Sequence, residues 1–502
     1  MKKDDGLPAS RIPQTIEDAI EMCIRLGERY LWADRLCIIQ DDAEDQKNQI
    51  EAMGTIYSSA QIVLVAAYGD SMEFGIPGIS RPRKLVQHSE DILGFRVTNV
   101  VREVDDDPLN MWNARGWTYQ EAVLSNRRLY FTDTRAFFEC ERSLCHEDQF
   151  NLETIRDDTI STRLILSEDR SRIQSFMRHL GHYTPRKLTY RSDTYKALYG
   201  ISRSLYNGED AFIHGLPVAD FDRALLWYAE TGRNAKEPHE SQGESLPTWS
   251  WASVMGLSDR VDYQRSHFYG SLALNGDGLS SCSIAAFNAH CGSNPDENWQ
   301  LYMAIAIKEG CVESVTLPFS LESDNFGTVR ELFNARWKDY DSFRHESIPV
   351  TIKKHGLPDG VPTDGTKQGI IATRSQTALL RVSPTDTWRV NIINSEGDRI
   401  GGLCGDAENL KAEALSGAYN SDVEFEFAAL SLSGVAFSNY SGEELLRKSY
   451  TDVDGKALSR VPIVNVLMII RNGGFARRRE VGWIELVDWA RLRRVWKVVV
   501  LE

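Results

Sequence analysis

The chain has 502 residues, of which 42% are hydrophobic and 26% are charged, so we expect a globular protein that divides into two or three domains. Its formal net charge of -15 argues against a nucleic-acid-binding protein, because phosphate binding requires a basic face. The longest apolar run, "VPIVNVLMII", is roughly half a membrane span, no signal peptide is recognisable, and the eight cysteines are irregularly spaced. We therefore expect a cytoplasmic protein with reduced thiols and no transmembrane segment.

The first stretch with clear periodicity is "PQTIEDAIEMCIRLG". Apolar residues recur at helical spacing from Ile16 to Ile24, Thr15 with Asp18 has the form of a capping box, and Gly27 is placed to end the helix. We expect one amphipathic helix here.

The next stretch, "RYLWADRLCIIQDD", predicts a buried strand at 30–33 and a second apolar run at 36–39. The polar residues that follow can cap a helix over roughly 43–59, with Tyr57 on its inward face. We expect Trp32 and Tyr57 to be core aromatic residues.

The run "QIVLVAA" at 61–67 is typical of a strand buried on both faces of a parallel sheet. After a loop marked by Gly and Pro, the helix in "RGWTYQEAVLSNRRLYF" is followed by two short strands, "RRLYFT" and "AFFEC". Helix alternating with buried strand indicates an α/β sheet, whose ligands lie at the carboxyl ends of the strands.

The remainder of the chain changes character twice. Residues 149–240 are mainly helical in pattern, most clearly in "DTYKALYGISRSL" and "FDRALLWYAE". Residues 241–502 contain short strand-like runs and a hairpin turn, "RNGGF", which together predict a β-rich C-terminal domain.

The candidate functional residue with the clearest pattern is Glu121. It follows Trp117 by four residues, so the carboxylate and the indole share a face of the helix. Partial desolvation there would raise the pKa of the carboxyl unless a donor such as an arginine holds it ionised. The alternative is a structural acid that pairs with Arg115, Arg127 or Arg128.

Asp34 is a second candidate because it directly follows a predicted strand, where α/β proteins present polar groups to ligands. An acid in that position can equally form a cap or a turn. Trp249 and Trp251 alternate as on one strand face, which favours packing between domains over a stacking platform for a ligand.

Other polar clusters favour structural roles. Cys140, Cys145 and His146 lack a second pair of ligands at zinc spacing, so we expect buried thiols and no metal site. His179 and His182 are expected as a surface pair. The basic run "ARRRE" at 476–480 is expected on a solvated hairpin edge.

Several of these motifs resemble one family. The stretches "RYLWADRLCIIQDD", "QIEAMGTIYSSAQIVLVAA", "ARGWTYQEAVLSNRRLYFTDTRAFFEC" and "LPTWSWASVMG" are similar, in this order, to the fungal heterokaryon incompatibility (HET) domain proteins. The resemblance implies a HET domain at 1–148, a helical region at 149–240 and a C-terminal domain at 241–502. It also implies non-self recognition that promotes programmed cell death when hyphae fuse.

The HET domain in turn resembles the Toll/interleukin-receptor (TIR) domain, a flavodoxin-like parallel sheet that in some members cleaves NAD. In those members a Trp and a Glu four residues later lie beside the nucleotide, a spacing that Trp117 and Glu121 reproduce. The resemblance implies Glu121 as the catalytic acid, contacts to the nucleotide from Asp34, Trp117 and Gln120, and NAD as a substrate with no cofactor required.

Two alternatives stay open at this level. The domain could be a non-enzymatic module that signals by self-association or by binding an incompatibility partner protein. It could also be an inactive relative, since family members open with a strand of the type "ALSYVWG" that is expected to be missing ahead of Thr15.

Overall fold

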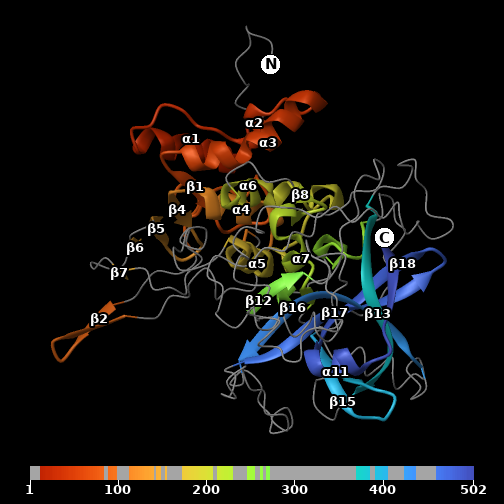
Figure 1. Cartoon of the computed structure of the whole chain (residues 1–502). Coiled ribbons are helices and arrows are strands. Elements are labelled where there is room, and N and C mark those ends of the chain that lie inside the picture. The colour runs from red at the N-terminus through yellow and green to blue at the C-terminus, as the bar shows by residue number, and fades with distance from the viewer. Residues whose placement is uncertain are drawn as a thin grey trace, which may run out of the picture. The chain divides into compact units, whose positions relative to one another are not determined.

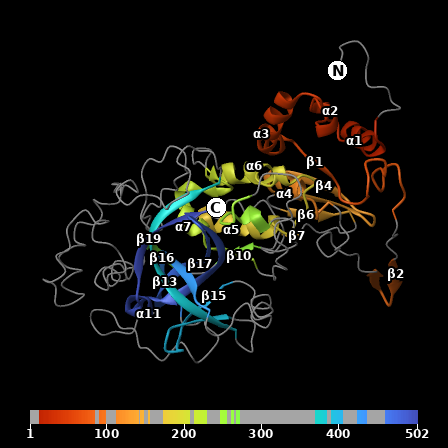
Figure 2. The same cartoon turned by 90° about the vertical axis from the view of Figure 1, so that its right-hand side faces the viewer.

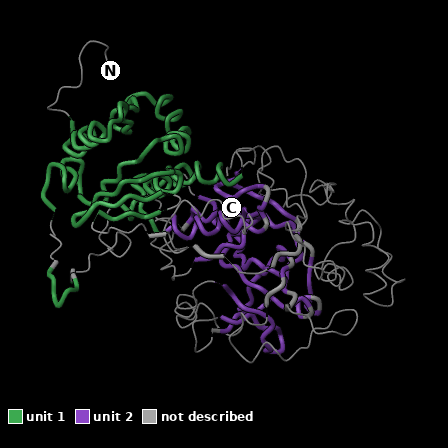
Figure 3. Tube along the Cα trace, turned by 90° about the vertical axis from the view of Figure 1, so that its left-hand side faces the viewer, with its two compact units in different colours: residues 1–170, 185–208 green, residues 171–184, 209–502 purple. Residues whose placement is uncertain are grey.

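The computed structural model describes the following residues: 12–83, 89–98, 112–140, 143–147, 153–154, 172–206, 212–229, 246–254, 261–263, 267–271, 369–384, 390–404, 423–436 and 460–502. The chain divides into two compact units (Figure 3). Unit 1 comprises residues 1–170 and 185–208, and unit 2 comprises residues 171–184 and 209–502. The helices of the middle region are therefore shared between the two units.

Unit 1 is a mixed α/β structure (Figure 1). Its elements in chain order are α1 (Gln14–Arg25), α2 (Asp34–Cys37), α3 (Ala43–Ser59), β1 (Val63–Ala66), β2 (Ser89–Ile92), β3 (Phe95–Thr98), α4 (Gly116–Leu124), β4 (Arg127–Phe131), β5 (Ala136–Cys140), β6 (Ser143–His146), β7 (Glu153–Thr154), η4 (Arg191–Asp193) and α6 (Lys196–Leu205).

Helix α1 ends as the sequence predicts. Gly27 adopts φ 76°, its N–H bonds the carbonyl of Ile24, and the N–H of Glu28 bonds the carbonyl of Cys23. These two bonds form a Schellman motif, in which glycine is favoured because the left-handed conformation places no strain on it.

The predicted capping box at the start of α1 is wrong. The N-cap is Pro13, and neither Thr15 nor Asp18 caps the helix. Their oxygens bind the loop after β1 instead: Thr15 accepts from Gly75 N at 3.2 Å, and the buried Asp18 carboxylate accepts from Ile76 N at 2.5 Å. The two side chains therefore fix a distant loop to α1.

The predicted strand at 30–33 is also wrong, because these residues form no strand and α2 begins directly after them. Trp32 packs edge-on against Tyr57 of α3, with ring centroids 5.9 Å apart. Helix α3 itself agrees with the prediction, and Asp42 caps it by accepting from Glu44 N and Asp45 N. A pair of aromatic rings, rather than a ladder of hydrogen bonds, holds the segment before α2.

The sheet of unit 1 has the strand order β1-β4-β5-β6-β7. The parallel pairing expected of the whole sheet occurs only between β1 and β4. The pairs β4 with β5, β5 with β6 and β6 with β7 are antiparallel. Val65, Ala67 and Tyr130 form a buried cluster on this sheet. The short turns between β4 and β6 explain the difference, because parallel neighbours require a long crossover connection.

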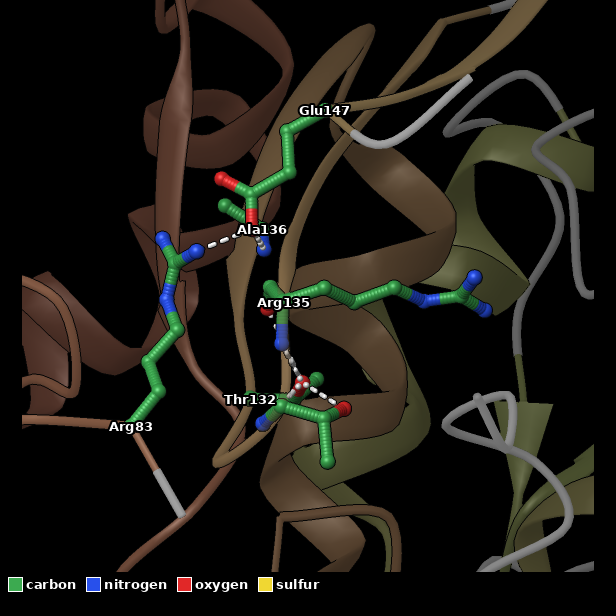
Figure 4. A network of polar contacts seen from close by, with 6 residues as sticks. Arg83, Thr132, Arg135, Ala136 and Glu147 are labelled. Carbon is green, nitrogen blue, oxygen red and sulfur yellow. Dashed lines mark hydrogen bonds and ion pairs between the residues drawn. The ribbon is translucent and has the colours of Figure 1, made fainter. Parts of the chain in front are cut away.

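Two polar networks brace this sheet. In the first, the Glu147 carboxylate accepts from the backbone N–H of Ala136 at 3.0 Å and pairs with the Arg83 guanidinium, while Thr132 binds the backbone of Arg135 in the adjacent turn (Figure 4). This network anchors Arg83, which precedes the β2–β3 hairpin in the chain, beside strand β5.

In the second network, the buried Arg128 guanidinium lies 3.1 Å from the Glu139 carboxylate on the neighbouring strand and also donates to the carbonyl of Ser125 at 2.6 Å. Tyr130 donates to the same carboxylate at 3.1 Å. The charge pair is compensated within the sheet, as a buried ion pair requires.

Helices α3, α4 and α6 pack against one another on unit 1 (Figures 1 and 2). The backbones of Gly54 in α3 and Gly200 in α6 approach so closely that a Cβ added at Gly200 would lie 3.0 Å from Gly54 Cα. Gln120 of α4 accepts a hydrogen bond from Gly200 N at 2.8 Å. The three helices therefore form a tightly fixed layer.

Unit 2 is β-rich, as predicted. Its elements are α5 (Arg172–Tyr183), β8 (Phe212–Ile213), β9 (Leu216–Pro217), η5 (Val218–Asp220), α7 (Phe221–Ala224), β10 (Trp227–Ala229), η6 (Trp251–Val254), β11 (Val261–Tyr263), β12 (His267–Ser271), β13 (Ile371–Pro384), β14 (Val390–Ile393), β15 (Arg399–Leu403), β16 (Phe425–Ala436), β17 (Arg460–Asn472), β18 (Phe475–Glu485), α11 (Leu486–Arg491) and β19 (Val495–Leu501).

Strands β13, β14, β15, β18, β17 and β16 pair in this order and close through the pairing of β16 with β13. The result is a closed barrel, which leaves these strands without a free edge. The "RNGGF" segment forms the hairpin turn between β17 and β18, as predicted. Within the described part of the chain, no helix is both long enough and apolar enough to cross a membrane.

Three expectations about unit 2 are wrong. The segment "FDRALLWYAE" is helical only over α7 and continues as strand β10. His179 is fully buried in α5 rather than exposed with His182. Trp249 precedes a turn of 3₁₀ helix that contains Trp251, so the two residues do not share a strand face. Both are fully buried within unit 2. The indole N–H of Trp249 donates to the carbonyl of Gly369, and that of Trp251 donates to the carbonyl of Gly215.

The basic run "ARRRE" is only partly solvated. Arg477 is exposed and pairs with Glu502 at 3.2 Å. Arg478 is buried, donates to the carbonyls of Leu225 and Trp227, and lies 3.8 Å from the centroid of the Trp227 ring. Alternation along strand β18 explains the difference, because successive side chains face opposite sides.

Candidate functional site

Helix α4 has two side chains that the rest of the fold covers only in part. Seven of its nine residues are buried, and the two that are only half-buried are Trp117 and Glu121. Four residues apart, these two lie on the same helical face. The only accessible face of an otherwise enclosed helix thus carries an indole and a carboxyl.

The nearest polar partner of Glu121 comes from a different helix. The hydroxyl of Tyr57, near the end of α3, lies close enough to the Glu121 carboxyl to act on its pKa as a hydrogen-bond donor. Trp32 packs edge-on against the Tyr57 ring. Tyr57 and Glu121 are therefore neighbours across the contact between α3 and α4.

Two charged residues act on this carboxyl. Burial raises the pKa of Glu121 to about 7, and the positive charge of Arg115 opposes that rise. The negative charge of Asp34 raises the pKa further, whereas the Tyr57 hydrogen bond lowers it. Burial and the nearby charges of Glu121 and Asp34 also raise the pKa of the Tyr57 hydroxyl, so this group stays a proton donor. Glu121 can thus gain or lose a proton near neutral pH, which ordinary glutamates cannot.

Three arginines lie near Glu121 in the sequence and are its possible partners in a structural ion pair. Arg128 is engaged with Glu139, and Arg127 directs its guanidinium to the carbonyl of Gln61 at 3.5 Å. Arg115, the N-cap residue of α4, is exposed and influences Glu121 through its charge. No salt bridge joins Glu121 to an arginine among the residues that the structure describes. Glu121 is therefore not part of the two polar networks that brace the sheet.

The remaining candidates fall in different places. Asp34 is exposed at the start of α2, where its carboxylate accepts from Arg35 N at 2.7 Å and its charge acts on Glu121. Gln120 is buried on another face of α4 and holds Gly200 of α6. Asp34 and Glu121 thus lie close enough for their charges to interact, whereas Gln120 lies in the packing layer of the three helices.

Sequence reasoning missed Tyr57, which it assigned to the core. The ring is indeed half-buried, but its hydroxyl also acts on the pKa of Glu121. The sequence contains one hint of this role. A tyrosine on the inward face of a helix needs a hydrogen-bond partner for its hydroxyl, whereas a phenylalanine would fill the same space without one. Sequence alone does not indicate which partner it finds.

The cysteine and histidine cluster on β5 and β6 has local partners. Cys140 Sγ lies 3.4 Å from Ser143 Oγ, and the His146 ring packs 5.4 Å from that of Phe137. In the ranges that the structure describes, no group of three or more metal-ligating side chains converges. The five cysteines in those ranges are free thiols.

The arrangement around Glu121 has definite chemical capacities. A carboxyl that titrates near neutral pH can act as a negative charge or as a general base at the pH of the cell. The flanking indole of Trp117 offers a flat apolar surface, and Asp34 adds an exposed acceptor for hydroxyl groups.

Comparison with known proteins gives one match. Residues 2–121 match the family model described as "Heterokaryon incompatibility protein (HET)"; the match includes α1 to α3 and the first part of α4, and it ends at Glu121. No curated protein and no solved structure matches the chain. The chain therefore carries a HET domain, the domain of the heterokaryon incompatibility family, over residues 2–121.

Proposed function

We propose that the HET domain of this protein cleaves NAD at the bond between nicotinamide and ribose, with Glu121 as the catalytic carboxylate. The observation that carries the proposal is the placement of Trp117 and Glu121 on the one accessible face of α4, where burial raises the pKa of the carboxyl to about 7. Loss of NAD would then promote death of the cell in which the domain becomes active, in keeping with the role of the family.

The charge on Glu121 suits this reaction. Departure of nicotinamide leaves positive oxocarbenium character on the ribose, which a fixed carboxylate in a partly desolvated position stabilises more strongly than water does. Nicotinamide leaves as a neutral amine that keeps both electrons of the broken bond, so no acid is needed to protonate it. One carboxylate is therefore sufficient.

The reaction balances with water as the second substrate. Water adds to C1′ of the ribose, the C1′–N bond breaks, and the products are nicotinamide, ADP-ribose and one proton. Glu121 in its ionised form can accept that proton, because its pKa of about 7 lies close to the pH of the cytoplasm. Asp34 and Trp117 would contact the ribose hydroxyls and the nicotinamide ring, respectively.

Similarity to TIR domains is part of this proposal. Support comes from the parallel pair β1 and β4 and from α4, which carries the Trp and Glu at the spacing of the NAD-cleaving members. Unit 1 departs from a flavodoxin-like sheet in its antiparallel strands β5 to β7. The proposal therefore depends on the geometry around α4 more than on the sheet as a whole.

The role in the cell can be tested by expression of the full chain in yeast, with NAD content and viability as readouts. We expect the wild-type chain to lower both and the Glu121→Gln chain to lower neither at equal protein level. Glu51→Gln, which changes an exposed glutamate of α3, serves as the matched control. Death that persists in Glu121→Gln cells with normal NAD would contradict the proposed chemistry.

A further inference from the structure

The β2–β3 hairpin exposes an unusual amount of apolar surface. Its strands pair from Ser89 with Thr98 to Ile92 with Phe95, and Leu93 and Gly94 form the turn. Four apolar side chains near the tip are open to solvent: Ile92 (51% exposed), Leu93 (93%), Phe95 (75%) and Val97 (52%). In Figures 1 and 2 the hairpin stands apart from the helices and from the main sheet of unit 1.

The turn itself is costly for this sequence. Leu93 has φ 54° and Gly94 has φ 84°, so both central residues adopt the left-handed conformation of a tight hairpin turn. Leucine in this conformation is disfavoured by about 1 kcal/mol relative to Gly or Asn. Since Leu93 is almost wholly exposed, it gains no burial within its own chain that would offset the strain.

The exposed residues lie on one face of the hairpin. Cross-strand partners point to the same side and side chains alternate along a strand, so Glu90, Ile92, Phe95 and Val97 share a face. A two-stranded ribbon with an uncovered apolar face is at best marginally stable by itself. Glu90 is exposed at the edge of this face and forms no salt bridge with any residue in the described ranges.

A second exposed apolar surface of unit 1 lies at the end of α1. Ile24 (65% exposed), Leu26 (42%) and Tyr30 (88%) flank the Schellman turn, which fixes their backbone; we call these three residues the α1 patch. The Arg29 guanidinium lies 6.0 Å from the centroid of the Tyr30 ring. It has no carboxylate partner among the side chains that the structure describes, so it offers a free positive charge beside the α1 patch.

We propose that the β2–β3 hairpin docks onto the α1 patch of a second copy of this chain. The two surfaces complement each other, because each is apolar, the hairpin carries the free acid Glu90 and the patch carries the free base Arg29. Within one copy both surfaces are exposed, so each copy offers one donor and one acceptor surface. Such a contact is heterologous and propagates head to tail.

The charge of the hairpin favours a protein over a lipid partner. Glu90 and Asp91 directly precede the apolar tip, and acidic residues there oppose insertion between anionic headgroups. The association goes beyond the proposed NAD chemistry and does not depend on it.

The decisive experiment uses two variants of the full chain, Phe95→Asp in the hairpin and Tyr30→Asp in the α1 patch, in sedimentation velocity over a concentration series. We expect the wild type to form a concentration-dependent series of oligomers and each variant alone to stay monomeric. A mixture of the two should form heterodimers and nothing larger, because each variant keeps one intact surface. Tyr190→Asp, at an exposed tyrosine outside both surfaces, should assemble like the wild type.

A charge swap tests the register of the contact. Glu90→Arg alone and Arg29→Glu alone should each weaken association by about fivefold, and the double variant should regain most of the loss. Three results would overturn the proposal. The first is a wild-type chain that stays monomeric, and the second is a mixture that fails to form heterodimers. The third is a monomeric chain that binds neutral vesicles in a Phe95-dependent manner. Circular dichroism identical to that of the wild type shows that each variant is folded.

Discussion

The Tyr57 hydroxyl acts on the pKa of the Glu121 carboxyl as a hydrogen-bond donor, across the contact between α3 and α4. Both side chains belong to helices that are fixed by α6 through the close contact of Gly54 and Gly200. A hydrogen bond to a charged acceptor in such a setting is stronger than one at an exposed site. We therefore expect Tyr57 to position Glu121.

Replacement of Tyr57 by Phe should raise the pKa of Glu121, because the Tyr57 hydroxyl favours the ionised carboxylate and phenylalanine lacks that hydroxyl. We expect the pH midpoint of nicotinamide release to move upward and the rate on its high-pH plateau to fall by roughly tenfold, since the carboxylate is then less well oriented. A pH–rate profile measures both. A profile that keeps its midpoint would show that Tyr57 does not act on Glu121.

The charges around Glu121 predict opposite shifts for two substitutions. Arg115→Gln removes a positive charge that lowers the pKa of Glu121, so the pKa should rise; Asp34→Asn removes a negative charge that raises it, so the pKa should fall. Carboxyl carbon NMR of the labelled protein gives the pKa without reference to activity. Arg127→Gln, which alters an exposed arginine at the start of β4, is the matched control and should leave the pKa unchanged.

Glu121 should also make stability depend on pH. The pKa of Glu121 is higher in the folded than in the unfolded chain. The contribution of this carboxyl to the stability of the fold is therefore fully present below the ordinary pKa of a glutamate, and it is lost as the pH rises through about 7. Glu121→Gln should therefore equal the wild type in stability near pH 4 and exceed it at pH 8.5 by on the order of 2 kcal/mol.

Urea unfolding at the two pH values measures this difference. A substitution that destabilises the protein equally at both would indicate that the carboxylate has a structural rather than a functional role.

The close contact between α3 and α6 should limit substitution at Gly200. An added Cβ would lie 2.8 Å from Gln120 Oε1, 2.9 Å from Leu124 Cδ1 and 3.0 Å from Gly54 Cα. Gly200→Ala should therefore lower the free energy of unfolding by about 1–3 kcal/mol, because the helices must separate. Ser204→Ala, at an exposed position of α6, should be close to neutral in the same thermal or urea unfolding measurement.

Local patterns predicted most of the individual elements. The termination of α1 at Gly27, the helix α3 after Asp42 and the β17–β18 hairpin depend on interactions between neighbours in sequence, and these can be read directly from the chain. The face shared by Trp117 and Glu121 follows from helical spacing in the same way.

Long-range partners could not be predicted in this way. Asp18 has the sequence form of a capping residue, yet its carboxylate binds Ile76 and Ser80, which are about sixty residues away in the chain. Arg478 in a basic run is buried against Trp227, about 250 residues distant. The hydroxyl of Tyr57 likewise needs a partner that only the packing of α3 on α4 determines.

The measurement that tests the central claim most directly is nicotinamide release from NAD by the purified full chain at pH 8, where Glu121 is ionised, beside Glu121→Gln and the control Glu51→Gln. We predict release by the wild type and by Glu51→Gln, and a loss of at least about a hundredfold in Glu121→Gln. Equal release by all three folded proteins would contradict the assignment of Glu121, and no release by any of them, at concentrations where the chain is assembled, would contradict the proposed activity.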